Sequence, residues 1–190
     1  MILVHFDTHR ANLVAKNITP PLNEVLRSVI KCNNAIKANA KCEPLFKQFC
    51  ENESADYVRL LLPTDVRWLS KGNCLKRFMV LYDILRVFLN NKPVDGKAFV
   101  SYLTDIFEKL NMLNKQLQGS SETHVDAKTK IFGFVTFIKV FQENISHKIF
   151  EQFHWLKECE MTVNAVLVIV DHLKIIVSDF KERFSDLIQI

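Results

Sequence analysis

Two short stretches of the sequence hold the side chains that are best suited to chemistry. The first, "HFDTHR", places His5, Asp7 and His9 at alternate positions. Two imidazoles and a carboxylate can bind a divalent cation, but these side chains share one face only if a β-strand continues through Arg10. Ordinary polarity at the end of a strand is the simpler interpretation. We therefore predict no metal site and no cofactor.

The second stretch, "TDVRWLSKGNCLKR", is locally basic, with five basic residues against one acidic between Arg59 and Arg77. Arginine presents a planar set of donors to phosphate, and an adjacent indole can stack on an unpaired base. On composition alone, the alternative is favoured: Trp68 packs in a helical core and Arg67 pairs with a carboxylate. The candidate nucleic-acid-binding residues are Arg67, Trp68, Lys71, Lys76 and Arg77.

Signatures of catalysis are missing from the sequence. It contains no G-x-G-x-x-G, no P-loop, no G-x-S-x-G and no clustered Cys/His pattern, and with four glycines it offers little for a phosphate-binding loop. The histidines from His124 onward stand singly, and the carboxylates are dispersed. We predict no catalytic residue and no enzymatic activity.

Composition predicts a soluble helical protein. Of 190 residues, 48% are apolar and 24% charged, which is typical of globular domains. Five cysteines without a C-x-x-C pair favour free thiols in a reducing compartment. The amino terminus lacks the features of a signal peptide, and the most apolar run, "VNAVLVIVDHLKIIV", is too short to span a bilayer. We expect a soluble intracellular protein with no membrane partner.

Hydrophobic periodicity predicts mainly helix, with two short strands near the front. The strands are "ILVHF" and "YVRLLLP", the second ended by Pro63. The last two helices are apolar on more than one side, which is expected of central helices. Helices are expected over residues 19–40, 43–51, about 69–90, 95–117, 125 to about 155, and 161–184.

The basic stretch resembles the "T-E-V-R-W-L-S-R-G-x-x-L-x-R" segment of hAT-superfamily transposases and of their domesticated relatives, the BED-type zinc-finger proteins of the Buster/Charlie branch. "HFDTHRANLVAK" is similar to that branch's "H-C-x-x-H-R-x-x-L-A-x-K", although Phe6 stands where the family has cysteine. The resemblance covers essentially the whole chain. The matching residues are Thr64, Val66, Arg67, Trp68, Leu69, Ser70, Gly72, Leu75 and Arg77 in the first motif, and His5, His9, Arg10, Leu13 and Lys16 in the second.

This resemblance implies a fragment of a longer protein with two parts. Residues 1–68 would be part of an RNase H-like core, and residues 69–190 an all-helical insertion domain. The family's D-D-E carboxylates would lie outside this sequence, and its tryptophan that stacks near a flipped base would correspond to Trp68. The fold class implied is mainly α, a helical bundle with two short strands from a truncated RNase H-like core.

Two functions follow as alternatives. One is a catalytically inactive, transposase-derived nuclear protein that retains DNA binding or a role in assembly. The other is a helical scaffold that binds a protein partner or a second copy of itself, with the basic stretch no longer in use. Steep salt dependence of binding to DNA would distinguish the first from the second.

Overall fold

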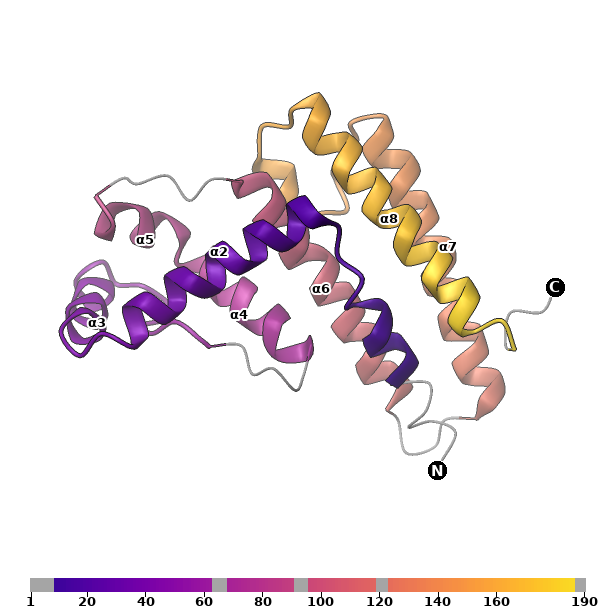
Figure 1. Ribbon diagram of the computed structural model, residues 1–190, viewed down its shortest axis with the longest axis horizontal. Helices are drawn as coiled ribbons and strands as arrows, with labels where there is room; N and C mark the ends of the chain where they lie inside the picture. The colour runs from indigo at the N-terminus through magenta and orange to yellow at the C-terminus, as the bar shows by residue number, and fades with distance from the viewer. Residues whose placement is uncertain (1–8, 63–67, 91–95, 119–122, 187–190) are drawn as a thin grey trace.

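The computed structural model describes residues 9–62, 68–90, 96–118 and 123–186, although not the side chains of Trp68, Leu69 and His124. The described residues form helices and connecting turns, without a strand (Figure 1). A short helical segment over residues 9–14 precedes the longer elements. These are α2 (Pro20–Lys37), α3 (Cys42–Asn52), α4 (Trp68–Val80), α5 (Tyr82–Phe88), α6 (Lys97–Leu117), α7 (His124–Ser146), the 3-10 turn η1 (Leu156–Glu158) and α8 (Val163–Arg183).

The helix starts follow from local sequence. Thr19 precedes two prolines at the first positions of α2. Proline lacks a backbone N–H, and at these positions an N–H group would have no carbonyl partner within the helix. Thr123 and Asp126 form a reciprocal capping box at the start of α7. The hydroxyl of Thr162 accepts a hydrogen bond from the N–H of Ala165 and caps α8. The expected helical segments are confirmed in order, but the segment expected over about 69–90 is divided into α4 and α5, and α7 is shorter than expected.

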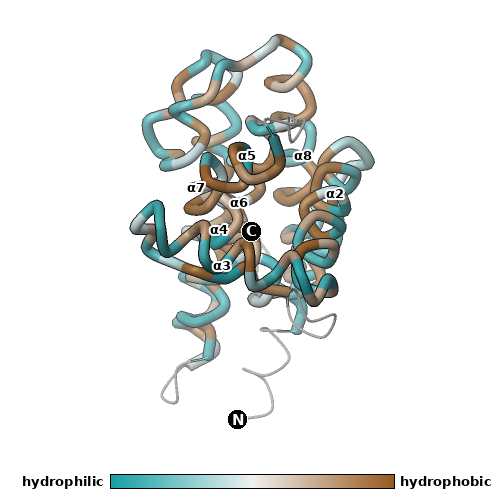
Figure 2. Tube along the Cα trace, turned by 90° about the vertical axis from the view of Figure 1, so that its left-hand side faces the viewer, coloured by the Kyte–Doolittle hydropathy of each residue, from teal (hydrophilic) through white to brown (hydrophobic). Residues whose placement is uncertain are grey.

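Helix α6 is the centre of the fold. It packs against α2, α4, α7, α8 and η1, and every residue from Val100 to Phe107 is buried. In Figure 2 the helices carry both hydrophilic and hydrophobic residues, as expected of helices with one buried side. The buried apolar residues form one continuous core from Ala11 to Phe184. The predicted domain boundary after residue 68 is not tested by this packing and stays a prediction.

Polar contacts join the beginning of the described chain to its end. Arg10 donates two hydrogen bonds to the carboxylate of Asp186, at 2.8 and 3.0 Å, and its guanidinium lies over the ring of Phe184. Asn17 donates to Asp179 at 3.2 Å. Arg10, predicted as part of a motif, therefore has a structural role here.

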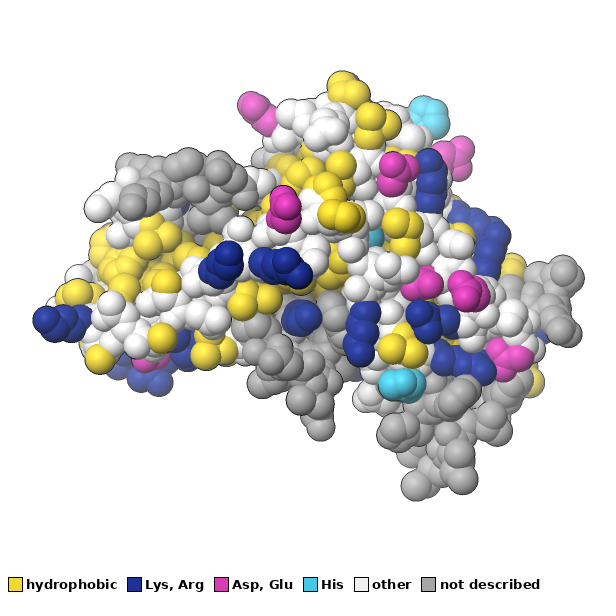
Figure 3. Space-filling model, in the orientation of Figure 1, with side chains coloured by type: hydrophobic (Ala, Val, Ile, Leu, Met, Phe, Trp, Pro, Cys, Tyr) yellow, Lys and Arg dark blue, Asp and Glu magenta, His cyan; other side chains and the backbone are white. Residues whose placement is uncertain are grey.

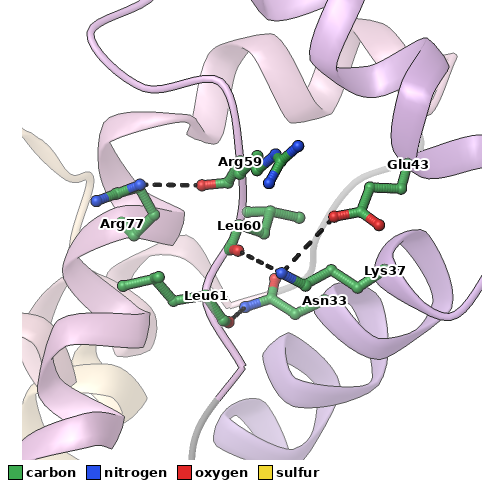
Figure 4. A network of polar contacts seen from close by, with 7 residues as sticks. All are labelled: Asn33, Lys37, Glu43, Arg59, Leu60, Leu61 and Arg77. Atoms are coloured by element: carbon green, nitrogen blue, oxygen red, sulfur yellow. Dashed lines mark hydrogen bonds and ion pairs between the residues drawn. The ribbon is translucent and has the colours of Figure 1, made fainter.

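The predicted strand at "YVRLLLP" is wrong within the described residues. Residues 57–62 are extended, but they pair with no strand, because side chains bind their carbonyl groups (Figure 4). Asn33 donates to the carbonyl of Leu61 at 3.0 Å, and Lys37 donates to that of Leu60 at 3.4 Å. The other predicted strand, "ILVHF", lies outside the described residues.

The strand required to align His5, Asp7 and His9 does not continue through Arg10, since residues 9–14 are helical. No group of three potential metal ligands occurs among the described side chains. None of the described helices is both long enough and apolar enough to cross a membrane.

Helix α7 ends at Ser146, well before the expected end near Trp155. The chain turns at Lys148, whose φ is 60°, and the N–H of Ile149 reaches back to the carbonyl of Asn144 at 2.8 Å. This local turn returns Phe153 and Leu156 to the core, where both are fully buried. Hydrophobic periodicity alone did not reveal this turn.

Candidate interaction surfaces

The predicted nucleic-acid-binding residues that the structure describes lie along α4, from Trp68 at its start to Arg77 in its last turn. Arg67 lies outside the described residues, and so does the side chain of Trp68, whose backbone begins the helix. Lys71 is half-buried and has an interaction partner of its own. The structure therefore describes side chains for three of the five predicted residues: Lys71, Lys76 and Arg77.

Arg77 is occupied by contacts within the chain. Its guanidinium carbon lies 3.4 Å from the centre of the Tyr57 ring, and Nη1 donates to the carbonyl of Arg59 at 3.1 Å. Both contacts hold residues 57–62 against α4, and Figure 4 shows the one with the carbonyl of Arg59. A stacked arginine that also binds a backbone carbonyl contributes to stability. Its donor groups are therefore only partly available to an external anion.

Lys76 lies on the exposed side of α4 and pairs with Glu108 of α6. The Nζ–Oε1 distance is 2.6 Å. The hydrogen bond that Lys76 donates to Glu108, followed by the charge of Glu108, raises the pKa of Lys76. The side chain keeps about half of its exposure, so the pair is a surface contact of small energetic value.

Other residues of the basic motif pack α4 against α6. A Cβ placed on Gly72 would meet the side-chain amide of Asn111 and lie 3.3 Å from the Cβ of Phe107. Leu75 is fully buried, and the thiol of Cys74 donates to the carbonyl of Leu61 at 3.1 Å. Close helix packing therefore accounts for Gly72 and Leu75 without any external partner.

A buried polar pair was not predicted from the sequence. The hydroxyl of Tyr102 and Nδ1 of His172 are 2.7 Å apart, and both residues are inaccessible to solvent. Burial lowers the pKa of His172 to about 4, although a hydrogen bond with the backbone of Asn17 acts to raise this pKa. The imidazole is therefore neutral near pH 7, and inside the core it bonds both the phenol of Tyr102 and the backbone of Asn17.

A second unpredicted group lies where α6 meets the turn before η1. The carboxylate of Asp105 accepts hydrogen bonds from the N–H groups of Trp155 and Leu156, at 3.0 to 3.2 Å. Burial raises the pKa of Asp105, while these N–H groups act to lower it. Asp105 therefore anchors the turn before η1, and its charged neighbours Lys109 and Glu108 lie on the same helix.

Lys109 secures the same turn one helical turn further along α6. Its Nζ donates to the carbonyl of Gln152 at 3.1 Å and lies 4.8 Å from the centre of the Phe141 ring. The rings of Phe137 and Phe153 are each 5.6 Å away. Burial lowers the pKa of Lys109, although the charge of Asp105 raises it.

Helix α7 has a second apolar side that is largely exposed, although Lys109 lies beside the ring of Phe137 at one edge of it. We name this side the α7 stripe; it comprises exposed, uncharged residues that recur at helical spacing. The opposite side of the helix, which includes Ile131, Ile138 and Phe141, is fully buried. The α7 stripe consists of Val125, Thr129, Phe132, Gly133, Thr136, Phe137 and Val140.

The exposure of the α7 stripe corrects one expectation. The sequence predicted that α7 would be a central helix, because it is apolar on more than one side. In the structure α7 lies at the edge of the molecule, next to α8 (Figure 1). Val125 is 70% exposed and Phe132 48%. The double-sided pattern was visible in the sequence, but it was assigned to burial within the chain.

Gly133 lies in the middle of the α7 stripe, and packing within the chain does not explain it. A Cβ added there would meet nothing within 4 Å. Glycine in the interior of a helix costs about 1 kcal/mol relative to alanine. A position that is open within the chain and lacks a side chain permits the close approach of another backbone.

Comparison with known families gives one match. The FAM200/GTF2IRD2 helical domain matches residues 5–146. This span crosses residue 68 and ends with the last residue of α7. No solved structure was found to match the chain.

Proposed function

Because this chain belongs to the FAM200/GTF2IRD2-like family of transposase-derived helical domains, we propose that it is a non-catalytic association module that binds a protein partner through the α7 stripe. The observation that carries the proposal is the second apolar side of α7. A helix with two apolar sides is typical of a buried element, and here the described chain buries one side and leaves the other largely exposed. The other side is available to a partner.

The energetic reason is the removal of apolar surface from water. Burying a valine or phenylalanine side chain stabilises an interface by about 1.5–3 kcal/mol relative to full exposure. Four such side chains in the α7 stripe are between 44% and 70% exposed: Val125, Phe132, Phe137 and Val140. Phenylalanine is enriched at the core of protein interfaces, and the α7 stripe offers Phe132 and Phe137.

The proposal assigns no reaction to this domain. The buried groups with shifted pKa values serve the fold: His172 bonds Tyr102, and Asp105 binds the backbone at Trp155 and Leu156. The nucleus as its site of action is also part of the proposal and is supported by the resemblance to domesticated transposases.

Site-specific photocrosslinking in cells tests the association. A photoreactive amino acid at Val140 should crosslink to a partner, whereas the same group at exposed Lys115 on α6 should not. The crosslink should disappear when Phe132→Asp is added, since a charge at the centre of the α7 stripe opposes apolar contact. Equal crosslinking from both positions, or none from Val140, would contradict the proposal.

DNA contact is a second candidate, supported by the start of α4. The first turn of this helix carries no acidic residue, and Lys71 follows Arg67 and Trp68 there. Helix N-termini favour anions. On the face drawn in Figure 3, by contrast, basic side chains occur in several separate places among apolar and acidic ones. The support for DNA contact is therefore restricted to this one helix end.

Salt-titrated binding to a DNA hairpin tests this candidate. Arg67→Ala and Lys71→Ala should each weaken binding and reduce the slope of log K against log salt by about 1. Trp68→Ala should also weaken binding if its indole stacks on a base. Arg77→Met should lower stability but leave the salt slope unchanged, because its guanidinium is held by Tyr57 and the Arg59 carbonyl. Absence of binding at about 50 mM salt would exclude DNA contact.

A further inference from the structure

We infer that the partner of the α7 stripe is an amphipathic helix whose apolar side is bordered by acidic residues. This inference rests on the proposed association through α7 and specifies the chemistry of the partner. Three properties of the described residues support it: the shape of the α7 stripe, the charges along its edges, and the poor electrostatic fit of a second copy.

The shape of the α7 stripe fits another helix. From Val125 to Val140 it extends about 22 Å along the helix axis, at about 1.5 Å per residue. Its middle contains the small residues Thr129, Gly133 and Thr136, and all three are exposed. Small side chains between larger ones allow two helix backbones to approach closely, so that ridges on one helix enter grooves on the other.

The edges of the α7 stripe are mainly basic. Lys128 and Lys139 lie on the same edge, about three helical turns apart. Both are exposed, and neither forms an ion pair within the described part of the chain. Lys130, on the opposite edge, donates to the carbonyl of Gln116 at 3.0 Å.

Two acidic residues of α7, Asp126 and Glu143, lie near the α7 stripe, against the three lysines at its edges. Asp126 accepts hydrogen bonds from the N–H and hydroxyl of Thr123 in the capping box, and these bonds lower its pKa. Glu143 lies beyond Val140, at the carboxyl end of the stripe. A partner with carboxylates along its edge would therefore complement Lys128 and Lys139.

A second copy of the chain fits the apolar residues but not the charges. An antiparallel copy would set Val125 against Val140 and Phe132 against Gly133, since these positions are symmetric about the middle of the stripe. The same two-fold symmetry would bring Lys128 of each copy close to Lys139 of the other. Two such contacts between like charges oppose the dimer. The charges therefore favour a different, acidic helix.

Two designed peptides of about 18 residues, long enough to cover the stripe, test the inference. Both carry leucine on one side; one has glutamate along both edges and the other has lysine at the same positions. In fluorescence anisotropy with the full chain, the acidic peptide should bind at least about tenfold more tightly at low salt, and the preference should shrink as salt screens the charges.

Charge reversal on the protein provides the decisive variant. Lys128→Glu with Lys139→Glu should reverse the preference towards the basic peptide. The matched control, Lys41→Glu with Lys157→Glu, changes the net charge equally at exposed positions outside α7 and should preserve the acidic preference. Phe132→Asp should weaken binding of both peptides; the charge-reversal pair remains informative if that variant folds poorly.

Equal or tighter binding of the basic peptide would overturn the inference. So would a dimer in analytical ultracentrifugation that Phe132→Asp abolishes, because the occupant would then be a second copy. If crosslinking from Val140 persists while the acidic preference is absent, only the acidic partner is wrong and association through α7 stands. If crosslinking is also absent, both conclusions fail.

Discussion

Gly72 and Gly133 are both glycines within helices, but their surroundings differ. Gly72 faces Asn111 and Phe107 of α6, whereas the space around Gly133 is open. Gly133→Ala should therefore raise the free energy of unfolding by about 0.5–1 kcal/mol, through better helix propensity alone. Gly72→Ala should lower it by about 1–3 kcal/mol, because the helix contact is overpacked.

Urea denaturation of the two alanine variants measures this difference. Each variant is the control for the other, since the same substitution is made in an α-helix. Equal stabilisation by both would show that α4 and α6 do not approach each other at Gly72 as closely as described.

His172 should make stability depend on pH below neutrality. Its pKa is lowered from about 6.5 to about 4 by burial, so the unfolded state binds more protons between these values. The stability that neutral His172 contributes is complete above pH about 6.5 and is lost as pH falls towards about 4, to an extent of about 3 kcal/mol.

His172→Gln tests this prediction, because the amide oxygen can accept the Tyr102 hydrogen bond but does not titrate. The free energy of unfolding of the variant should change less between pH 6.5 and pH 4 than that of the parent chain. The comparison of slopes removes the contribution of Asp105, which both proteins share. Parallel pH profiles would mean that His172 is already charged in the folded protein.

The extended residues 57–62 are held by elements on either side of them. Asn33 and Lys37 from α2 bind the carbonyls of Leu61 and Leu60, and Arg77 from α4 binds that of Arg59 (Figure 4). Asn33 is fully buried. Without Asn33 the carbonyl of Leu61 keeps only the thiol of Cys74, a weak donor, at 3.1 Å. Loss of the donor of a largely buried carbonyl costs about 1–3 kcal/mol.

Asn33→Ala should therefore lower the free energy of unfolding by about 1–3 kcal/mol. The control is Asn34→Ala, the same change at the next, exposed position of α2, which should stay within about 0.5 kcal/mol. Chemical denaturation compares them directly. A loss as large for Asn34→Ala would indicate a general effect on α2 and not on the extended segment.

Helix positions could be predicted because their signals are local. Thr19 with two prolines marks the start of α2, and Gly96 precedes α6, which was expected to end at Leu117 and does so. The extended segment could not be predicted in the same way. An apolar run ended by proline predicts a strand, but donors from Asn33, Lys37 and Arg77 replace the neighbouring strand, and these residues are remote in sequence.

The basic motif was predictable as a unit, but not the role of each residue. Gly72 and Leu75 serve the α4–α6 contact, and Arg77 stacks on Tyr57. These are long-range contacts that residue type and spacing do not encode. The resemblance therefore identified a transposase-derived family, while the structure shows that part of the motif stabilises the fold.

For the molecule as a whole, the arrangement around α6 leaves α7 at an edge with one apolar side covered. The sequence showed that α7 has two apolar sides, but which side the chain covers depends on the packing of α6 and α8. The start of α4 and the α7 stripe are thus separate candidate surfaces, one suited to an anion and the other to an amphipathic helix. Each makes a different prediction about where a partner binds.

The most direct measurement is a pair of NMR titrations of the isotope-labelled chain, one with the acidic peptide and one with the DNA hairpin. Association through α7 predicts that the peptide shifts the amide signals of Val125 to Val140 and leaves those of Lys71 to Arg77 in place. Peptide-induced shifts confined to other elements, or shifts at the start of α4 with DNA and none in α7 with the peptide, would contradict it.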